Sequence, residues 1–231
     1  MSGHDHSHGP SISAGGMHRK RLLIVLGITS TVLVAELIGA HVTGSLALLA
    51  DAGHMFTDVA GILLAVLAVT FASRPPTPER TFGYYRLEIL AAVVNAVLLF
   101  GVAVYILWEA WQRWNAPPEV EGGLMLAFAA VGLVANIIGL LVLRDGAKES
   151  LNLKGAYLEV FSDMLGSVGV IVAAVIIFTT GWRYADPLIG AGIGLFILPR
   201  TWKLSAQAVR ILMEVAPPGL DVDQVRARIL T

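Results

Sequence analysis

One apolar stretch, residues 46–66, carries three ionisable side chains, and this combination restricts the chain more than any other feature. Asp51, His54 and Asp58 stand three and four residues apart, so a helix places all three on one face. An ionisable group at the centre of a bilayer costs about 2.5–3.5 kcal/mol on insertion scales. The stretch is otherwise apolar enough to lie in a membrane. Its three polar groups therefore predict a partner on another helix.

A second apolar stretch, residues 157–174, offers that partner, because Glu159 and Asp163 stand one helical turn apart within it. Zn²⁺ prefers four ligands in a tetrahedron, with His nitrogen or carboxylate oxygen at about 2.0–2.2 Å. Two ligands at i and i+4 on each of two helices supply such a set. We predict that four side chains converge on one divalent cation: His54, Asp58, Glu159 and Asp163. Asp51 is a candidate accessory ligand that could stage release, and a structural hydrogen bond is an equally good interpretation of it.

Composition places the chain among multi-pass membrane proteins. Of its 231 residues 56% are hydrophobic and only 14% are charged, whereas soluble domains contain about 25% charged residues. The net charge is −1 and the basic residues are dispersed, which argues against nucleic acid as a partner. The chain has no cysteine, so disulfides and thiolate metal sites are excluded. A metal site here must use His and carboxylate ligands.

The pattern of apolar runs predicts an all-α membrane protein with six transmembrane helices. The runs cover about 22–42, 46–71, 84–113, 122–143, 155–179 and a shorter sixth run that begins at Asp186. Lys and Arg residues flank the first run and fill the loops that follow the second and fourth, whereas the opposite side has only Arg113 and Arg183. Basic loops stay in the cytoplasm, so we expect both termini to be cytoplasmic and the chain to lie in the inner (plasma) membrane.

The two ends of the chain differ from its apolar centre. Residues 1–18 are rich in Gly and Ser and are predicted to be a disordered cytoplasmic tail. In this tail His4, His6 and His8 form a tract that binds transition metals weakly or serves only as a polar end. Residues 19–213 are predicted to form the transport domain. Residues 214–231 are interpreted as the start of a cytosolic C-terminal domain that is largely absent from this chain.

A metal site of this kind predicts exchange with protons. Without metal, three carboxylates lie close together and must take up protons, and an arriving metal ion displaces those protons. An inward proton gradient could then drive metal out of the cytosol. The four residues could instead form two polar pairs that hold helices together, but their presence on two separate spans favours the metal site. A passive metal-gated channel and an intramembrane metal sensor are alternatives that use the same ligands. The chain has no HExxH motif and we expect no enzymatic activity.

Four runs of the chain resemble the cation diffusion facilitator family, and most closely its bacterial cobalt–zinc–cadmium resistance branch. They are SLALLADAGHMFTD, RTFGYYRLEILAAVVNAVLLFGVAVYILWEAW, LNLKGAYLEVFSDMLGSVGVI and GLFILPRTW, which extend over nearly all of residues 20–215. The resemblance implies Zn²⁺/H⁺ antiport by a homodimer that rocks between inward-open and outward-open states. It implies no cofactor beyond the transported metal, and it places the transport site at His54, Asp58, Glu159 and Asp163.

The chain departs from the family pattern in ways that bear on metal preference. Zinc-selective animal members usually have His where this chain has Glu159, and the added carboxylate makes the site harder, so Cd²⁺ and Co²⁺ are also candidate substrates. Some relatives place a metal site in the loop between the second and third spans, but that loop has no His here. The family also suggests a charge interlock at the cytoplasmic ends of spans three and six, where Arg86 and Glu214 stand. The alternative is that these are two unrelated interfacial charges.

Overall fold

The computed structural model describes residues 11–72, 86–213, 215 and 228, and among these residues it contains helices and no strand. The prediction of an all-α fold is therefore confirmed. Six long helices and one short 3-10 turn follow one another along the chain: α1 (Ser11–Thr43), α2 (Leu46–Ala72), α3 (Arg86–Asn115), α4 (Gly122–Leu143), η1 (Gly146–Lys148), α5 (Leu151–Thr180) and α6 (Ala185–Leu212).

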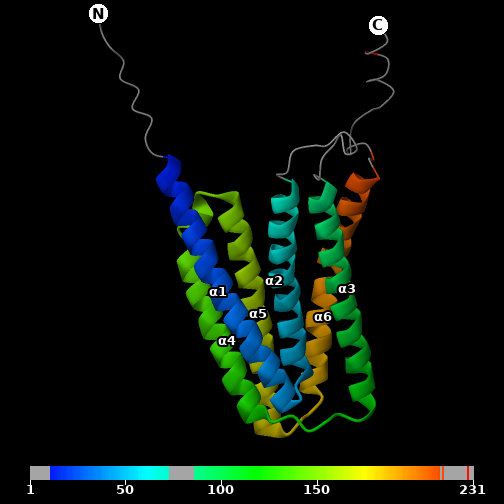
Figure 1. Cartoon of the computed structure of the whole chain (residues 1–231). Helices are drawn as coiled ribbons and strands as arrows, with labels where there is room; N and C mark the ends of the chain where they lie inside the picture. Colours follow the sequence, from blue (N-terminus) through cyan, green and yellow to red (C-terminus); the bar gives the residue numbers. More distant parts are fainter. Residues whose placement is uncertain (1–10, 73–85, 214, 216–227, 229–231) are drawn as a thin grey trace, which may run out of the picture.

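The helices run alternately up and down, so that α1 begins and α6 ends at the same end of the bundle (Figure 1). We call this the inner end, because the basic flanks described above lie there, and we call the opposite end the outer end. Helices α1 to α5 each contain a segment long and apolar enough to cross a membrane. α6 does not meet that criterion, but its 28 residues extend about 42 Å. α6 therefore runs the length of the bundle, packed mainly against α3.

The predicted disorder of residues 1–18 is wrong over residues 11–18, because α1 already begins at Ser11. Helix nucleation is costly, but each residue added to an existing helix gains one backbone hydrogen bond. The apolar span can thus extend into the polar segment before it. Residues 1–10, with His4, His6 and His8, lie outside the described residues. So do Glu214 and the side chain of Arg86, and the charge interlock stays a prediction.

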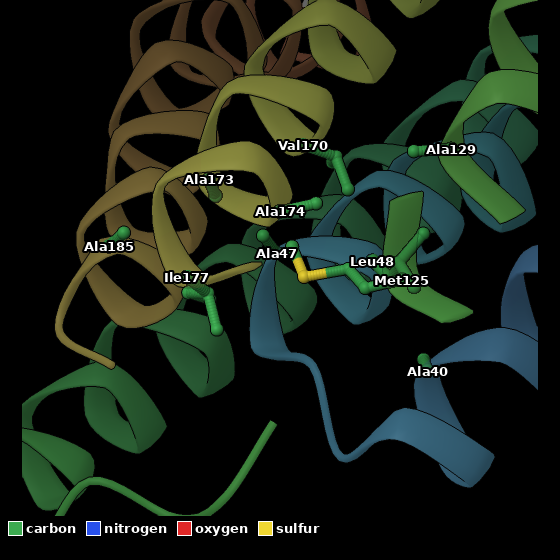
Figure 2. Packing of buried hydrophobic residues seen from close by; sticks show 10 residues of the cluster. All are labelled: Ala40, Ala47, Leu48, Met125, Ala129, Val170, Ala173, Ala174, Ile177 and Ala185. Carbon is green, nitrogen blue, oxygen red and sulfur yellow. The ribbon is translucent and has the colours of Figure 1, made fainter. Parts of the chain in front are cut away.

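A tightly packed apolar core closes the outer end of the bundle (Figure 2). Five helices contribute to it, and small side chains predominate, which allows the helix backbones to approach closely. The core consists of Ala40, Ala47, Leu48, Met125, Ala129, Val170, Ala173, Ala174, Ile177 and Ala185. Because these contacts join helices from both sides of the bundle, they hold the outer end together.

A fully buried carboxylate, Asp186, joins the start of α6 to the start of α2. One of its oxygens accepts a hydrogen bond of 2.6 Å from the Ser45 hydroxyl. The backbone N–H groups of Leu46 and the residue after it donate to the same carboxylate at 2.7 and 3.0 Å. The first N–H groups of a helix have no intrahelical partner and carry the positive end of its dipole, so a carboxylate there is stabilised. We call this arrangement the outer latch.

Arg113, at the end of α3, completes the outer latch. Its guanidinium Nη1 lies 3.6 Å from an Asp186 oxygen and donates a 2.6 Å hydrogen bond to the Gly44 carbonyl. Gly44 adopts a left-handed backbone with φ of 68°, a conformation that glycine reaches without strain. The short turn between α1 and α2 is thereby fixed to both α3 and α6.

We expect Asp186→Asn to lower the stability of the bundle. The substitution weakens charge-assisted hydrogen bonds, each of which contributes about 1.5–3 kcal/mol, and brings an amide NH₂ toward backbone donors. Thermal unfolding of the purified chain in detergent measures the change as a lower midpoint. Glu119→Gln is the matched control, because Glu119 is exposed and its pair with Arg183 lies on the surface, where ion pairs contribute little. An unchanged midpoint in Asp186→Asn would contradict the role of the latch.

Candidate metal centre

The structure brings the four candidate ligands together from two antiparallel helices. His54 and Asp58 stand one turn apart on α2, and Glu159 and Asp163 stand one turn apart on α5. The His54 Nε2 atom lies 3.6 Å from an Asp58 oxygen, 3.9 Å from a Glu159 oxygen and 3.8 Å from an Asp163 oxygen. One imidazole nitrogen therefore lies within 3.9 Å of an oxygen of each of three carboxylates.

These distances suit a tetrahedral metal ion. Ligand bonds of about 2.0–2.1 Å imply donor atoms about 3.3–3.4 Å apart, so each observed separation needs to shorten by only about half an ångström. His54, Asp58 and Asp163 each offer a ligand atom within 4.8 Å of the others. Glu159 lies at the inner edge of this group, and its longer side chain gives it the reach to complete a set of four. The donor set, one imidazole and three carboxylates, suits Zn²⁺ and also harder divalent ions.

The centre is covered on its outer side and more accessible on its inner side. Because α2 and α5 are antiparallel, His54 and Asp163 form the outer pair, and their side chains are 10% and 3% exposed. Asp58 and Glu159 form the inner pair and are 20% and 26% exposed. The apolar outer core, shown in Figure 2, includes Ala47 and Val170, which stand about two helical turns outward of His54 and Asp163 on α2 and α5. The exposed fraction of the candidate ligands therefore rises toward the inner end.

Asp51 lies one turn outward from the centre and takes part in a hydrogen-bonded chain of side chains. The Ser167 hydroxyl donates to an Asp51 oxygen at 3.3 Å, and the Asn136 amide donates to Ser167 at 3.2 Å. All three side chains are buried. Both interpretations of Asp51 given above, a release site and a structural hydrogen bond, are compatible with this position, and the hydrogen bond is present.

Sequence reasoning missed the contribution of Ser167. The available signal was its position four residues after Asp163, which places it on the same face of α5. Serine is common in membrane helices, and only the packing of α5 against α2 and α4 distinguishes this residue from the others.

Comparison with known proteins gives a consistent result. The model of the cation efflux transmembrane domain matches residues 22–213. The metal cation efflux system protein CzcD of Cupriavidus metallidurans is 49% identical over 229 residues, which are 99% of this chain and 71% of that protein. The zinc transporter ZitB of Escherichia coli is 46% identical over 97% of this chain and 72% of its own length. A Bacillus velezensis protein named as a cadmium, cobalt and zinc/H⁺-K⁺ antiporter is 40% identical over 96% of this chain and 70% of its own length.

We expect Asp163→Asn to weaken zinc binding severely. Removal of a residue that hydrogen-bonds to a metal ligand lowers metal affinity about 10–100-fold, and removal of a ligand itself should lower it further. Isothermal titration calorimetry of the purified chain with Zn²⁺ measures the effect. Asp145→Asn makes the same chemical change at an exposed position and should retain the affinity of the unmodified chain. Equal affinities in the two variants would remove Asp163 from the ligand set.

Proposed function

This chain belongs to the cation diffusion facilitator family, in its cobalt–zinc–cadmium resistance branch, and from that premise we propose that it exports Zn²⁺ from the cytosol in exchange for protons by alternating access. It is a multi-pass inner-membrane protein and a transporter of divalent metal cations rather than an enzyme. The name of the Bacillus velezensis relative includes cadmium and cobalt, and we extend Cd²⁺ and Co²⁺ to this chain as candidate substrates.

The observation that carries the proposal is the cluster of His54 with Asp58, Glu159 and Asp163 at 3.6–3.9 Å. We assign these four side chains as the ligands of the transported ion. Two separate polar pairs would require only that each side chain contact one partner on the other helix. The shared centre around one imidazole nitrogen is better explained by an ion that all four bind.

Exchange with protons follows from the charge of this centre. Three ionised carboxylates within one turn of one another repel strongly in a medium of low dielectric constant, and either a divalent ion or protons relieve that repulsion. Metal ions and protons therefore compete to neutralise the negative charge inside the bundle, and a proton gradient across the membrane can displace the metal. The name of the Bacillus velezensis relative includes such an exchange and supports the proposal.

Alternating access is supported by the unequal covering of the two ends. The outer side of the centre is covered by apolar packing, and the inner pair of ligands is partly exposed, which suits a state that loads metal from the cytosol. Release outside then requires the packed outer core to separate.

Lipid and a second copy of the chain are the expected partners. Trp108, Trp111 and Trp114 are exposed near the outer end of α3, and tryptophan is typical of membrane–water interfaces. We extend the homodimer of the family to this chain, and mass photometry in detergent tests it.

A flux assay tests the proposed antiport. Proteoliposomes that contain the purified chain should accumulate Zn²⁺ when their lumen is acidic, because protons leaving the lumen drive metal in. Accumulation should stop when an ionophore collapses the gradient, and it should be absent in Asp58→Ala and Asp163→Ala. Flux that ignores the gradient would identify a passive channel, and binding without flux would identify a sensor. Competition by Cd²⁺ and Co²⁺ in the same assay measures selectivity.

Single cysteines test the direction of access, and the chain has no other cysteine to interfere. Gly155 precedes Glu159 by one turn on α5 and has open space around it, so Gly155→Cys should react with a membrane-impermeant thiol reagent from the inner face. Ala174, fully buried in the outer core, should be protected in Ala174→Cys until turnover opens the outer end. Rapid labelling of Ala174→Cys without metal or a gradient would contradict the proposed closed outer end.

A further inference from the structure

Two carboxylates outside the metal centre are buried in the described part of the bundle. Glu36 on α1 is 1% exposed and Asp51 on α2 is 2% exposed. Neither oxygen of Glu36 accepts a hydrogen bond from any described residue. Within the described part of the chain, no Lys or Arg forms an ion pair with either carboxylate. Burial of such groups is costly unless something compensates them, which points to a cation from outside the chain.

The oxygens of these carboxylates converge on one small space beside α4. A Cβ atom added to Gly132 would lie 2.5 Å from Glu36 Oε1 and 3.4 Å from the Ser167 hydroxyl. The same hydroxyl donates to Asp51 at 3.3 Å, so a single serine links the surroundings of both carboxylates. A Cβ atom at Gly166 would overlap an Asp51 oxygen. Glycine at these two positions leaves the room that the carboxylates occupy.

This cluster lies between the metal centre and the outer core. Asp51 precedes His54 by three residues on α2, and Ser167 follows Asp163 by four on α5, so both stand about one turn outward of the ligands. The residues one turn farther out belong to the apolar outer core shown in Figure 2, among them Ala40 after Glu36 and Ala47 before Asp51. Opening of the outer core would therefore expose this cluster before the metal centre.

We propose that Glu36, Asp51 and Ser167 form a second cation site, which takes the monovalent cation exchanged for the transported metal. The inference rests on the proposed function and names the binding site of the counter-cation. The three donors are all oxygens, and oxygen ligands without imidazole suit hard cations rather than Zn²⁺. A hydronium ion and an alkali ion such as K⁺ share this chemistry.

Repulsion between cations gives the second site its role. A divalent ion at the metal centre and a cation one helical turn away repel each other across a medium of low dielectric constant. The charged groups that face Glu36 are Asp51 from α2 and Asp163 from α5, and α4 contributes the neutral Asn136. Occupation of one site therefore disfavours occupation of the other, which is the property that an exchanger requires.

Flux under two separate gradients tests the proposal with the full chain in proteoliposomes. Zn²⁺ flux is measured under a pH gradient at equal K⁺ and under a K⁺ gradient at equal pH, and the gradient that accelerates flux identifies the counter-cation. Glu36→Gln and Asp51→Asn should each reduce that acceleration by about tenfold or more, the effect expected from the loss of one charged contact. Exchange of radiolabelled for unlabelled Zn²⁺ needs no counter-cation and should persist in Glu36→Gln, and calorimetry of that variant should show zinc affinity close to that of the unmodified chain. Glu119→Gln is the control for the removal of an exposed carboxylate.

Each contrary outcome has a distinct meaning. Full gradient dependence in both variants would overturn the second site. A parallel loss of zinc affinity and self-exchange would also overturn it, because the residues would then belong to metal binding. The same holds if calorimetry shows a second bound Zn²⁺ in the unmodified chain that is absent in Glu36→Gln. If the unmodified chain responds to neither gradient, the proposed antiport itself is wrong.

A steric variant tests the same site without removing charge. Gly132→Ala places a methyl group against Glu36 and Ser167 and should reduce gradient dependence while Zn²⁺ self-exchange continues. Gly123→Ala lies on the same helix, where the added methyl meets only ordinary contacts with Phe178, and should behave as the unmodified chain. Equal gradient dependence in the two glycine variants would overturn the proposal.

Discussion

The burial of negative charge inside a helical bundle is the constraint on which this structure depends. Five carboxylates lie buried or half-buried within the bundle, those of Glu36, Asp51, Asp58, Glu159 and Asp163, and three of them lie within 3.9 Å of the His54 imidazole. A membrane offers no water to solvate them, so their compensation must come from protein groups or from bound cations. This requirement explains why the polar faces of α2 and α5 lie toward each other inside the bundle.

The covering of the bundle is graded along its axis. At the outer end, small apolar side chains and the outer latch bring five helices into close contact. Toward the inner end, the exposed fraction of the ligands rises from 3% at Asp163 to 26% at Glu159. The proposed ion exchange requires such a difference between the two sides, because a site open to both at once would let the gradients run down.

Much of this arrangement could be predicted from local sequence. Apolar run lengths identify the helices, and the i, i+4 spacing of His54 with Asp58 and of Glu159 with Asp163 identifies faces that must meet. The structure brings those faces together, and the binding of metal by them stays a prediction. The first turns of α1 were missed because glycine and serine resemble a disordered tail, while helix propagation from the span overrides that weak preference.

Contacts between distant helices could not be predicted in the same way. Asp186 reads as an ordinary helix start, and its bonds to Ser45 and Leu46 depend on where α6 and α2 begin relative to each other in space. The link from Ser167 to Asp51 depends likewise on the rotation of α5 about its axis. Such rotations are set by the packing of many side chains at once, and no single spacing in the sequence encodes them.

The outer latch also bears on how an ion would leave. It fastens α2 to α6 and, through Arg113, to α3, so under the proposed alternating access we expect the outer end to open between α5 and α2 rather than between α2 and α6. Two ligands would then travel with each helix, and the coordination number of the ion would fall from four to two in the same movement. Opening of the outer end and weakening of the ion's coordination would then occur in one movement, with no separate step between them.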